Sequence, residues 1–297
     1  MKCDLCPRKC LVDRKKGEKG ICGQTENLKV ARAALHFWEE PCISGDAGSG
    51  AVFFSGCPLH CVFCQNENIA NGTVGKEISL ERLVDIFLEL QEKRANNINL
   101  VTPGHFVPQI VKALDQARKE GLTLPVVYNT SSYETVDTIK MLEGYVDIYL
   151  PDFKYMSPVL SKKYSHAPDY AEVAKAAIAE MVRQTGKAVF VNGDEDNLIL
   201  SGTIVRHLTL PGCMADSMQI LKYLHETYGD MIYISIMNQF TPLSSLEKYP
   251  ELNRRITDEE YETLVDYAID IGIENGFIQE GNTAEESFIP AFDCEGV

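Results

Sequence analysis

The chain has 297 residues, of which 45% are hydrophobic and 24% are charged, and its formal net charge is −15. This composition is ordinary for a globular protein with a sizeable core, and the acidic excess argues against general affinity for a nucleic-acid backbone. The excess is uneven, because residues 1–33 carry nine Lys or Arg against four Asp or Glu. This basic head would suit an acidic partner, although a solvated surface is the simpler interpretation.

No apolar run approaches the ~20 residues of a membrane span, and the first residues, MKCDLCPRKC, lack the apolar core of a signal peptide. We therefore expect a cytoplasmic protein that makes no contact with a membrane. In that compartment the ten cysteines are expected to be metal ligands or buried thiols rather than disulfides.

The first group of cysteines lies near the N-terminus and consists of Cys3, Cys6, Cys10 and Cys22. Four thiols are enough to hold either an auxiliary [4Fe-4S] cluster or a structural zinc ion. The spacing alone does not distinguish these two metals.

Short β-branched or aromatic runs then alternate with longer helical patterns. The expected strands are 51–56, 98–101, 125–130, 146–152, 203–212 and 231–237, and the expected helices are 79–95, 107–121, 134–144, 170–186, 215–229 and 258–272. Six strand–helix units predict parallel strands with right-handed crossovers, in either an open doubly wound sheet or a partial barrel. One interruption, residues 189–202, is expected to form a hairpin whose acidic turn contains Asp194, Glu195 and Asp196.

Polar residues follow the ends of these strands. In both folds the chemistry belongs at the carboxyl ends of the strands. The candidates there are Cys57 after the first strand, Thr102 to His105 after the second, Asn129, Thr130 and Ser131 after the third, Asp152 and Lys154 after the fourth, and Arg206 and His207 in the fifth.

The stretch GCPLHCVFCQN, residues 56–66, places Cys57, Cys61 and Cys64 on one short loop in a CxxxCxxC pattern. Three thiolates can hold three corners of a cubane [4Fe-4S] cluster and leave one iron with an open site. A zinc site is the alternative, and it would need a fourth ligand such as His60.

With this loop placed after the first strand, the chain resembles the radical S-adenosylmethionine superfamily. The runs GSGAVFFSGCPLHCVFCQN, CDLCPRKCLVDRKKGEKGICG, HFWEEPCISG, VTPGHFVPQI and IVRHLTLPG resemble its branch of pyruvate formate-lyase activating enzyme-like proteins. The resemblance implies an α/β fold, a partial (βα)6 TIM-like barrel in residues 51–297, preceded by a cysteine-rich metal-binding extension in residues 1–50. It also implies that the open iron binds S-adenosylmethionine, whose reductive cleavage yields a 5′-deoxyadenosyl radical.

The resemblance also suggests roles for individual residues. Phe63 would lie beside adenine, and Asn129, Thr130 and Ser131 would bind ribose hydroxyls or the methionine carboxylate. Arg206 is the candidate for that carboxylate, whereas His207, on the opposite face of the strand, is expected to pack outward. Family members often end the second strand with a GGE-like sequence that binds the amino group; here Thr102 or His105 would take that place. Asp152 and Lys154 match the DxK pattern of the activating enzymes and are, with His105, the expected catalytic residues.

The expected reaction is hydrogen abstraction from a protein or small-molecule substrate, with activation of a glycyl radical enzyme as one form of it. The implied partners are S-adenosylmethionine, a cytosolic electron donor and, in one form of the reaction, a protein substrate. A non-catalytic iron–sulfur or zinc protein that transfers electrons or binds metal is the alternative. Cys42, Cys213 and Cys294 remain, and each is expected to be a packing residue.

Overall fold

The computed structural model describes residues 2–193, 197–242, 244–279 and 290–297. Its strands are β1 Leu28–His36, β2 Ser49–Phe54, β3 Lys76–Ile78, β4 Ile98–Val101, β5 Val126–Thr130, β6 Ile148–Pro151, β7 Val189–Phe190, β8 Ile199–Leu208, β9 Tyr233–Met237 and β10 Gly276–Ile278. Its α-helices are α1 Pro41–Ser44, α2 Glu67–Ala70, α3 Leu80–Glu92, α4 Val107–Lys119, α5 Val136–Lys140, α6 Pro158–Ser165, α7 Tyr170–Thr185, α8 Met214–Tyr228 and α9 Asp258–Asp270.

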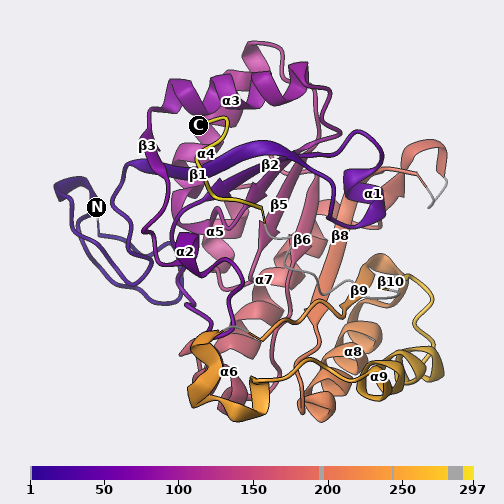
Figure 1. Ribbon diagram of the computed structural model, residues 1–297. Coiled ribbons are helices and arrows are strands. Elements are labelled where there is room, and N and C mark those ends of the chain that lie inside the picture. Colours follow the sequence, from indigo (N-terminus) through magenta and orange to yellow (C-terminus); the bar gives the residue numbers. More distant parts are fainter. Residues whose placement is uncertain (1, 194–196, 243, 280–289) are drawn as a thin grey trace.

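The six expected strands form the centre of one curved sheet (Figure 1). Their order is β2-β4-β5-β6-β8-β9, and every neighbouring pair in it is parallel. The strand–helix alternation produces this order because each helix returns the chain to the end of the sheet at which the next strand begins. The prediction of an α/β partial barrel is therefore confirmed.

The outer face of the sheet packs against helices α3, α4, α5 and α7. The apolar side of α3 buries Leu83, Phe87 and Leu90 against Leu100 and other outward-facing strand residues. Ser79 begins this helix by accepting a hydrogen bond from the Arg82 backbone N–H, as a capping serine should. The helices thus hold the sheet from outside and leave the strand ends for the site.

The inner face of the sheet is filled by the N-terminal segment. After β1 the chain turns into the short helix α1, whose Cys42 and Ile43 are buried against Val127, Ile148 and Leu150. Cys42 is therefore a core thiol, as expected from its residue type. β1 is antiparallel to β2, so it ends at the amino end of β2, where His36 pairs with Ser49, and residues 36–40 enter the sheet interior from that end.

Four strands lie outside the six that were expected. β1 pairs antiparallel with β2 and with β3, while β10 extends the other edge of the sheet and β7 pairs with β8. β1 gave a weak strand signal because Lys29 and Arg32 interrupt its apolar residues. Since β1 joins the sheet, residues 1–50 contribute to the barrel as well as to the head, and the boundary after residue 50 stays a prediction.

The β7–β8 pairing agrees with the expected hairpin at residues 189–202. The acidic turn that was expected at Asp194, Glu195 and Asp196 lies outside the described residues. Among the helices that are described, none is long and apolar enough to cross a membrane.

The cysteine-rich head, residues 2–27, projects at one side of the molecule beside α2 (Figure 1). Arg14 anchors it, because this buried side chain donates hydrogen bonds to the carbonyl oxygens of Thr25 and His105. The guanidinium carbon also lies 5.3 Å from the centre of the Phe106 ring, a cation–π contact. Arg14 thus helps to fix a segment that has few apolar side chains of its own.

We predict that Arg14→Ala destabilises the protein by about 2–3 kcal/mol, because it leaves buried carbonyl oxygens without a donor. The neighbouring Lys15 is exposed, so Lys15→Ala should change stability by less than about 0.5 kcal/mol. Urea unfolding measures both variants, and limited proteolysis should cut residues 2–27 faster in the Arg14 variant alone. Equal stability of the two variants would contradict this role of Arg14.

Candidate active site at the carboxyl ends of the parallel strands

The carboxyl ends of the strands surround a cavity of about 260 Å³. This volume lies just below the ~300–1,000 Å³ of small-molecule sites, so a larger partner could insert only a side chain or a short loop. The sequence-predicted residues that line it are Cys57, Cys61, Phe63, Cys64, Thr102, Asn129, Thr130, Ser131, Asp152, Lys154 and Arg206. The C-terminal residues add Pro290 to the wall, and Phe292 packs on Phe53, with 5.4 Å between the ring centres.

The three thiols of the CxxxCxxC loop lie on one side of this cavity. Cys61 Sγ accepts a hydrogen bond of 2.9 Å from Ser165 Oγ at the end of α6. Burial raises the pKa of Cys57 to about 11 and that of Cys64 to about 12, and the nearby Cys61 raises both further. Lys154 acts in the opposite direction on both thiols, which places its ammonium group close to them.

Three thiols on one loop can hold three iron atoms of a cubane iron–sulfur cluster. Within the described residues, no three His, Cys, Asp or Glu side chains stand close enough to hold one metal ion. Thiolates on a cubane bind different iron atoms and therefore stand farther apart than the ligands of one ion. Because iron must displace the thiol protons, the raised pKa values make cluster binding a proton-releasing event.

A buried network of charges forms the floor of the cavity. Arg206 donates to Asp152 Oδ1 at 2.9 Å, to Glu39 Oε2 at 3.0 Å and to Asn129 Oδ1 at 2.7 Å. Lys154 Nζ donates to Asp152 Oδ2 at 2.6 Å. Burial alone would raise the pKa of Asp152, but Arg206 and Lys154 lower it, so this carboxyl is ionised.

Glu39 is the residue of this network that the sequence analysis did not propose. Its Oε1 accepts hydrogen bonds from Asn99 and Asn129, at 3.0 and 3.1 Å. Arg206 Nη2 also lies 2.9 Å from Asp152 Oδ1, so all three nitrogens of the guanidinium group contact protein partners. The binding of a methionine carboxylate by Arg206 stays a prediction. Glu39 already accepts a hydrogen bond from one nitrogen of the guanidinium group.

The remaining residues at the strand ends are oriented by local hydrogen bonds. The Thr130 hydroxyl donates to Glu134 and accepts from the Ser132 backbone N–H, so it can meet a ligand only as an acceptor. Phe63 packs edge-on against Tyr155 and Phe240 while it faces the cavity. Thr102 has a φ of +55°, so the chain turns sharply as it leaves β4.

That turn takes His105 away from the cavity. His105 is buried, and its Nε2 lies 2.7 Å from the Ser55 carbonyl oxygen. Burial lowers its pKa to about 3, so it is a neutral core residue. The structure therefore corrects the expectation that His105 is catalytic or binds the amino group. His207 packs outward as expected, between the Phe153 carbonyl and the Ser217 hydroxyl.

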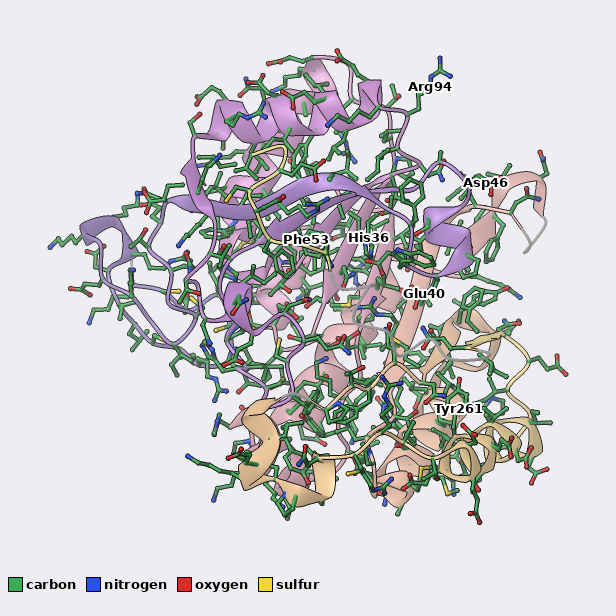
Figure 2. The ribbon with its side chains drawn as sticks, viewed as in Figure 1. His36, Glu40, Asp46, Phe53, Arg94 and Tyr261 are labelled. Atoms are coloured by element: carbon green, nitrogen blue, oxygen red, sulfur yellow. The ribbon has the colours of Figure 1, made fainter. Side chains whose placement is uncertain are left out.

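Other lining residues come from the segment that follows β1. His36 and Trp38 line the cavity beside Glu39. Figure 2 shows His36 next to Phe53, and their ring centres are 6.0 Å apart. Burial lowers the pKa of His36 to about 4, with Arg32 and Arg206 adding to the effect, so its imidazole is neutral.

The four N-terminal cysteines gather in the head, next to the cluster loop. The pKa of Cys6 is raised to about 12, mainly by burial and also by the nearby Cys22, Cys10 and Cys3. A Cβ at Gly20 would stand 2.8 Å from Cys10 Sγ, so the backbone passes close to this group.

Three contacts join the head to the loop. Arg8 Nε donates to the Pro58 carbonyl at 2.9 Å, and His60 Nε2 lies 2.8 Å from the Ile21 carbonyl oxygen. A Cβ at Gly56 would be 2.5 Å from the Cys22 carbonyl oxygen. The two cysteine groups are therefore separated by little more than one layer of backbone.

A second hollow adjoins the cavity across Trp38, Glu39 and Gln239, which line both. It measures about 790 Å³, and Phe37, Asp46, Asn96 and Gln279 contribute to its wall. A substrate larger than the inner cavity could rest in it.

Three comparisons with known proteins agree with this arrangement. The radical SAM superfamily model matches residues 51–197. An uncharacterized protein of Methanocaldococcus jannaschii is 27% identical over 275 residues, which are 90% of this chain and 74% of that protein.

Two solved structures share the fold. The S-adenosylmethionine-bound structure of Streptococcus suis SuiB has a TM-score of 0.52 at 13% identity, with 80% of this chain and 51% of that chain covered. HydG, a maturase of the [FeFe]-hydrogenase, has a TM-score of 0.51 at 15% identity, with 78% and 52% covered. This chain spans about half the length of these two proteins, and the likeness is one of fold.

We predict that Glu39→Gln destabilises the protein by about 3 kcal/mol, because it leaves the buried Arg206 charge with one carboxylate fewer. Glu262 on α9 supplies the control, because it is exposed. Glu262→Gln should change stability by less than about 0.5 kcal/mol. Urea unfolding at pH 7 compares the two variants, and equal stability of both would contradict the network.

A further prediction concerns Glu134, whose pKa is raised to about 7, mainly by burial and additionally by Asp152. Between about pH 4.5 and pH 7 the folded chain keeps a proton that the unfolded chain has lost, so this group lowers stability as pH rises through that window. Glu134→Gln should remove this fall and gain up to about 3 kcal/mol over the parent at pH 8. Unfolding curves at pH 5 and pH 8 test it; parallel pH profiles of the two proteins would contradict it.

Proposed function

The chain belongs to the radical SAM superfamily, and we propose on that premise that it abstracts hydrogen from an organic substrate. In this proposal Cys57, Cys61 and Cys64 hold a [4Fe-4S] cluster. When bound, this cluster would supply the open iron and the electron for cleavage of S-adenosylmethionine to a 5′-deoxyadenosyl radical. The observation that carries the proposal is that the three thiols and the Asp152–Lys154–Arg206 network line one cavity.

The protein residues would bind and orient S-adenosylmethionine. Phe63 offers a ring face beside the thiol loop for the adenine. Thr130 and Ser131 would bind the ribose or the carboxylate, and Arg206, which lines the cavity, would attract that carboxylate by its charge. Arg206 is already fixed by Glu39, Asp152 and Asn129, so little side-chain entropy would be lost on binding.

Lys154 and Asp152 would act at the reacting end of the ligand. Their ion pair is 2.6 Å long, and both groups are largely buried. A fixed pair of opposite charges stabilises charge that moves in the reaction without reorganising solvent. The side chains of His36 and Met237 in the cavity wall would limit access of water to a reactive radical.

We further propose that Cys3, Cys6, Cys10 and Cys22 bind a second metal centre. Their mutual proximity in the head supports this. Four thiols suit a [4Fe-4S] cluster or a zinc ion, and metal binding would also order a segment that has little apolar core of its own.

The substrate would approach from the second hollow, across Trp38 and Gln239. A protein could present one loop there, as in the activation of a glycyl radical enzyme, and a small molecule could occupy the same space. The resemblance to pyruvate formate-lyase activating enzyme-like proteins motivates the first form, and the polar wall at Asn96 and Gln279 accommodates either.

The test is formation of 5′-deoxyadenosine from S-adenosylmethionine by the anaerobically reconstituted protein with a chemical reductant. The parent should form it, and Cys61→Ala should lose at least about 100-fold, since removing a ligand removes the cluster site. Cys294→Ala is the matched control, because Cys294 lies in the C-terminal residues away from the loop, and it should keep parental activity. No product from a parent with full iron content would overturn the proposal.

A further inference from the structure

We infer that the basic head is the docking surface for an acidic protein that delivers single electrons to this enzyme. The inference rests on the proposed function, because reductive cleavage of S-adenosylmethionine consumes one electron in each event. In that transfer the donor protein is oxidised by one electron and the enzyme is reduced by one. The surface is defined by the exposed lysines of the head, Lys2, Lys9, Lys15, Lys16 and Lys19.

The charge distribution of the chain points to this surface. Residues 1–33 carry nine of the 28 Lys and Arg residues and only four of the 43 Asp and Glu residues. The rest of the chain therefore has 19 basic against 39 acidic residues and would repel an acidic protein. In residues 2–21 the five exposed lysines face only two exposed acids, Asp4 and Glu18. An acidic donor would be steered to the head and away from the body.

Apolar side chains complete the surface. Leu11 and Ile21 are among the exposed large hydrophobic residues of the protein, at 52% and 49% exposure. Each lies next to a head cysteine in the sequence, Cys10 and Cys22 respectively. Apolar contacts surrounded by charged residues are the usual composition of a transient protein interface.

The position of the head supplies the second, independent argument. The Arg8 side chain donates to the Pro58 carbonyl, and the backbone carbonyls of Ile21 and Cys22 lie against His60 and Gly56 of the thiol loop. Arg8 also donates to the carbonyl of Ser165, whose hydroxyl donates to Cys61 Sγ. A protein docked on the head would therefore be separated from the thiol loop by the head alone.

The opposite side of the molecule lacks this combination. Helices α8 and α9 lie at the far end from the head (Figure 1). The first turn of α9 is acidic, with Asp258, Glu259 and Glu260. A negatively charged donor would meet repulsion there and would be remote from the thiols.

The first test measures the binding of an acidic [2Fe-2S] ferredoxin to the reconstituted enzyme. Anaerobic calorimetry gives the affinity at 50 and 300 mM salt. The triple variant Lys15→Glu, Lys16→Glu, Lys19→Glu should bind on the order of tenfold or more weakly at low salt, and the parent should lose affinity at high salt. The control has the same change in charge and consists of Lys93→Glu, directly after α3, with Lys112→Glu and Lys119→Glu on α4. This control should bind ferredoxin as the parent does. Equal weakening in both triple variants, or no salt dependence, would overturn the inference.

The second test separates this inference from the proposed function. With a small chemical reductant, the parent and the head variant should form 5′-deoxyadenosine at the same rate; with reduced ferredoxin, only the head variant should slow, on the order of tenfold. Failure of all proteins with the chemical reductant would overturn the proposed function. Equal rates of parent and head variant with both reductants would overturn the docking surface and leave the proposed function intact.

Discussion

The arrangement of the site depends on one buried cation, Arg206, which a strand carries into the interior of the sheet. A buried charge is tolerated only with good partners, and those of Arg206 come from three distant parts of the chain: Glu39, Asn129 and Asp152. Glu39 reaches Arg206 because residues 36–40 enter the sheet interior between β1 and α1. The same pairing fixes Asp152, and through it Lys154, beside the three thiols of the loop.

The cysteine-rich head is also held in place by arginine side chains. It has little apolar core of its own, so polar contacts from Arg8 and Arg14 hold it against the barrel. Gly56, with a φ of +94°, is required where the Cys22 carbonyl meets the loop, because a side chain there would collide with it. The two cysteine groups are thus parts of one structural unit. Metal binding in either group is expected to favour the loop conformation that the other needs.

Much of the fold could be predicted from the sequence, because six buried strands and their helices give strong local patterns. The thiol loop was equally visible, since its three cysteines lie within eight residues. Glu39 was not, because its partners Asn129 and Arg206 are 90 and 167 residues away. His105 was expected at the cavity because it follows a strand. A position after a strand does not show which way the side chain points, and the chain turns at Thr102, whose φ is positive, so that His105 lies against Ser55. β1 was missed because charged residues interrupt its apolar pattern.

The central claim is that Cys57, Cys61 and Cys64 hold a cluster whose fourth iron binds S-adenosylmethionine. Electron–nuclear double resonance tests it most directly, on the reduced protein in which the four head cysteines are replaced by serine. S-Adenosylmethionine labelled with ¹⁷O in its carboxylate and ¹⁵N in its amino group should show hyperfine coupling of both nuclei to the cluster. A reduced cluster that shows no coupling to either label would contradict the account.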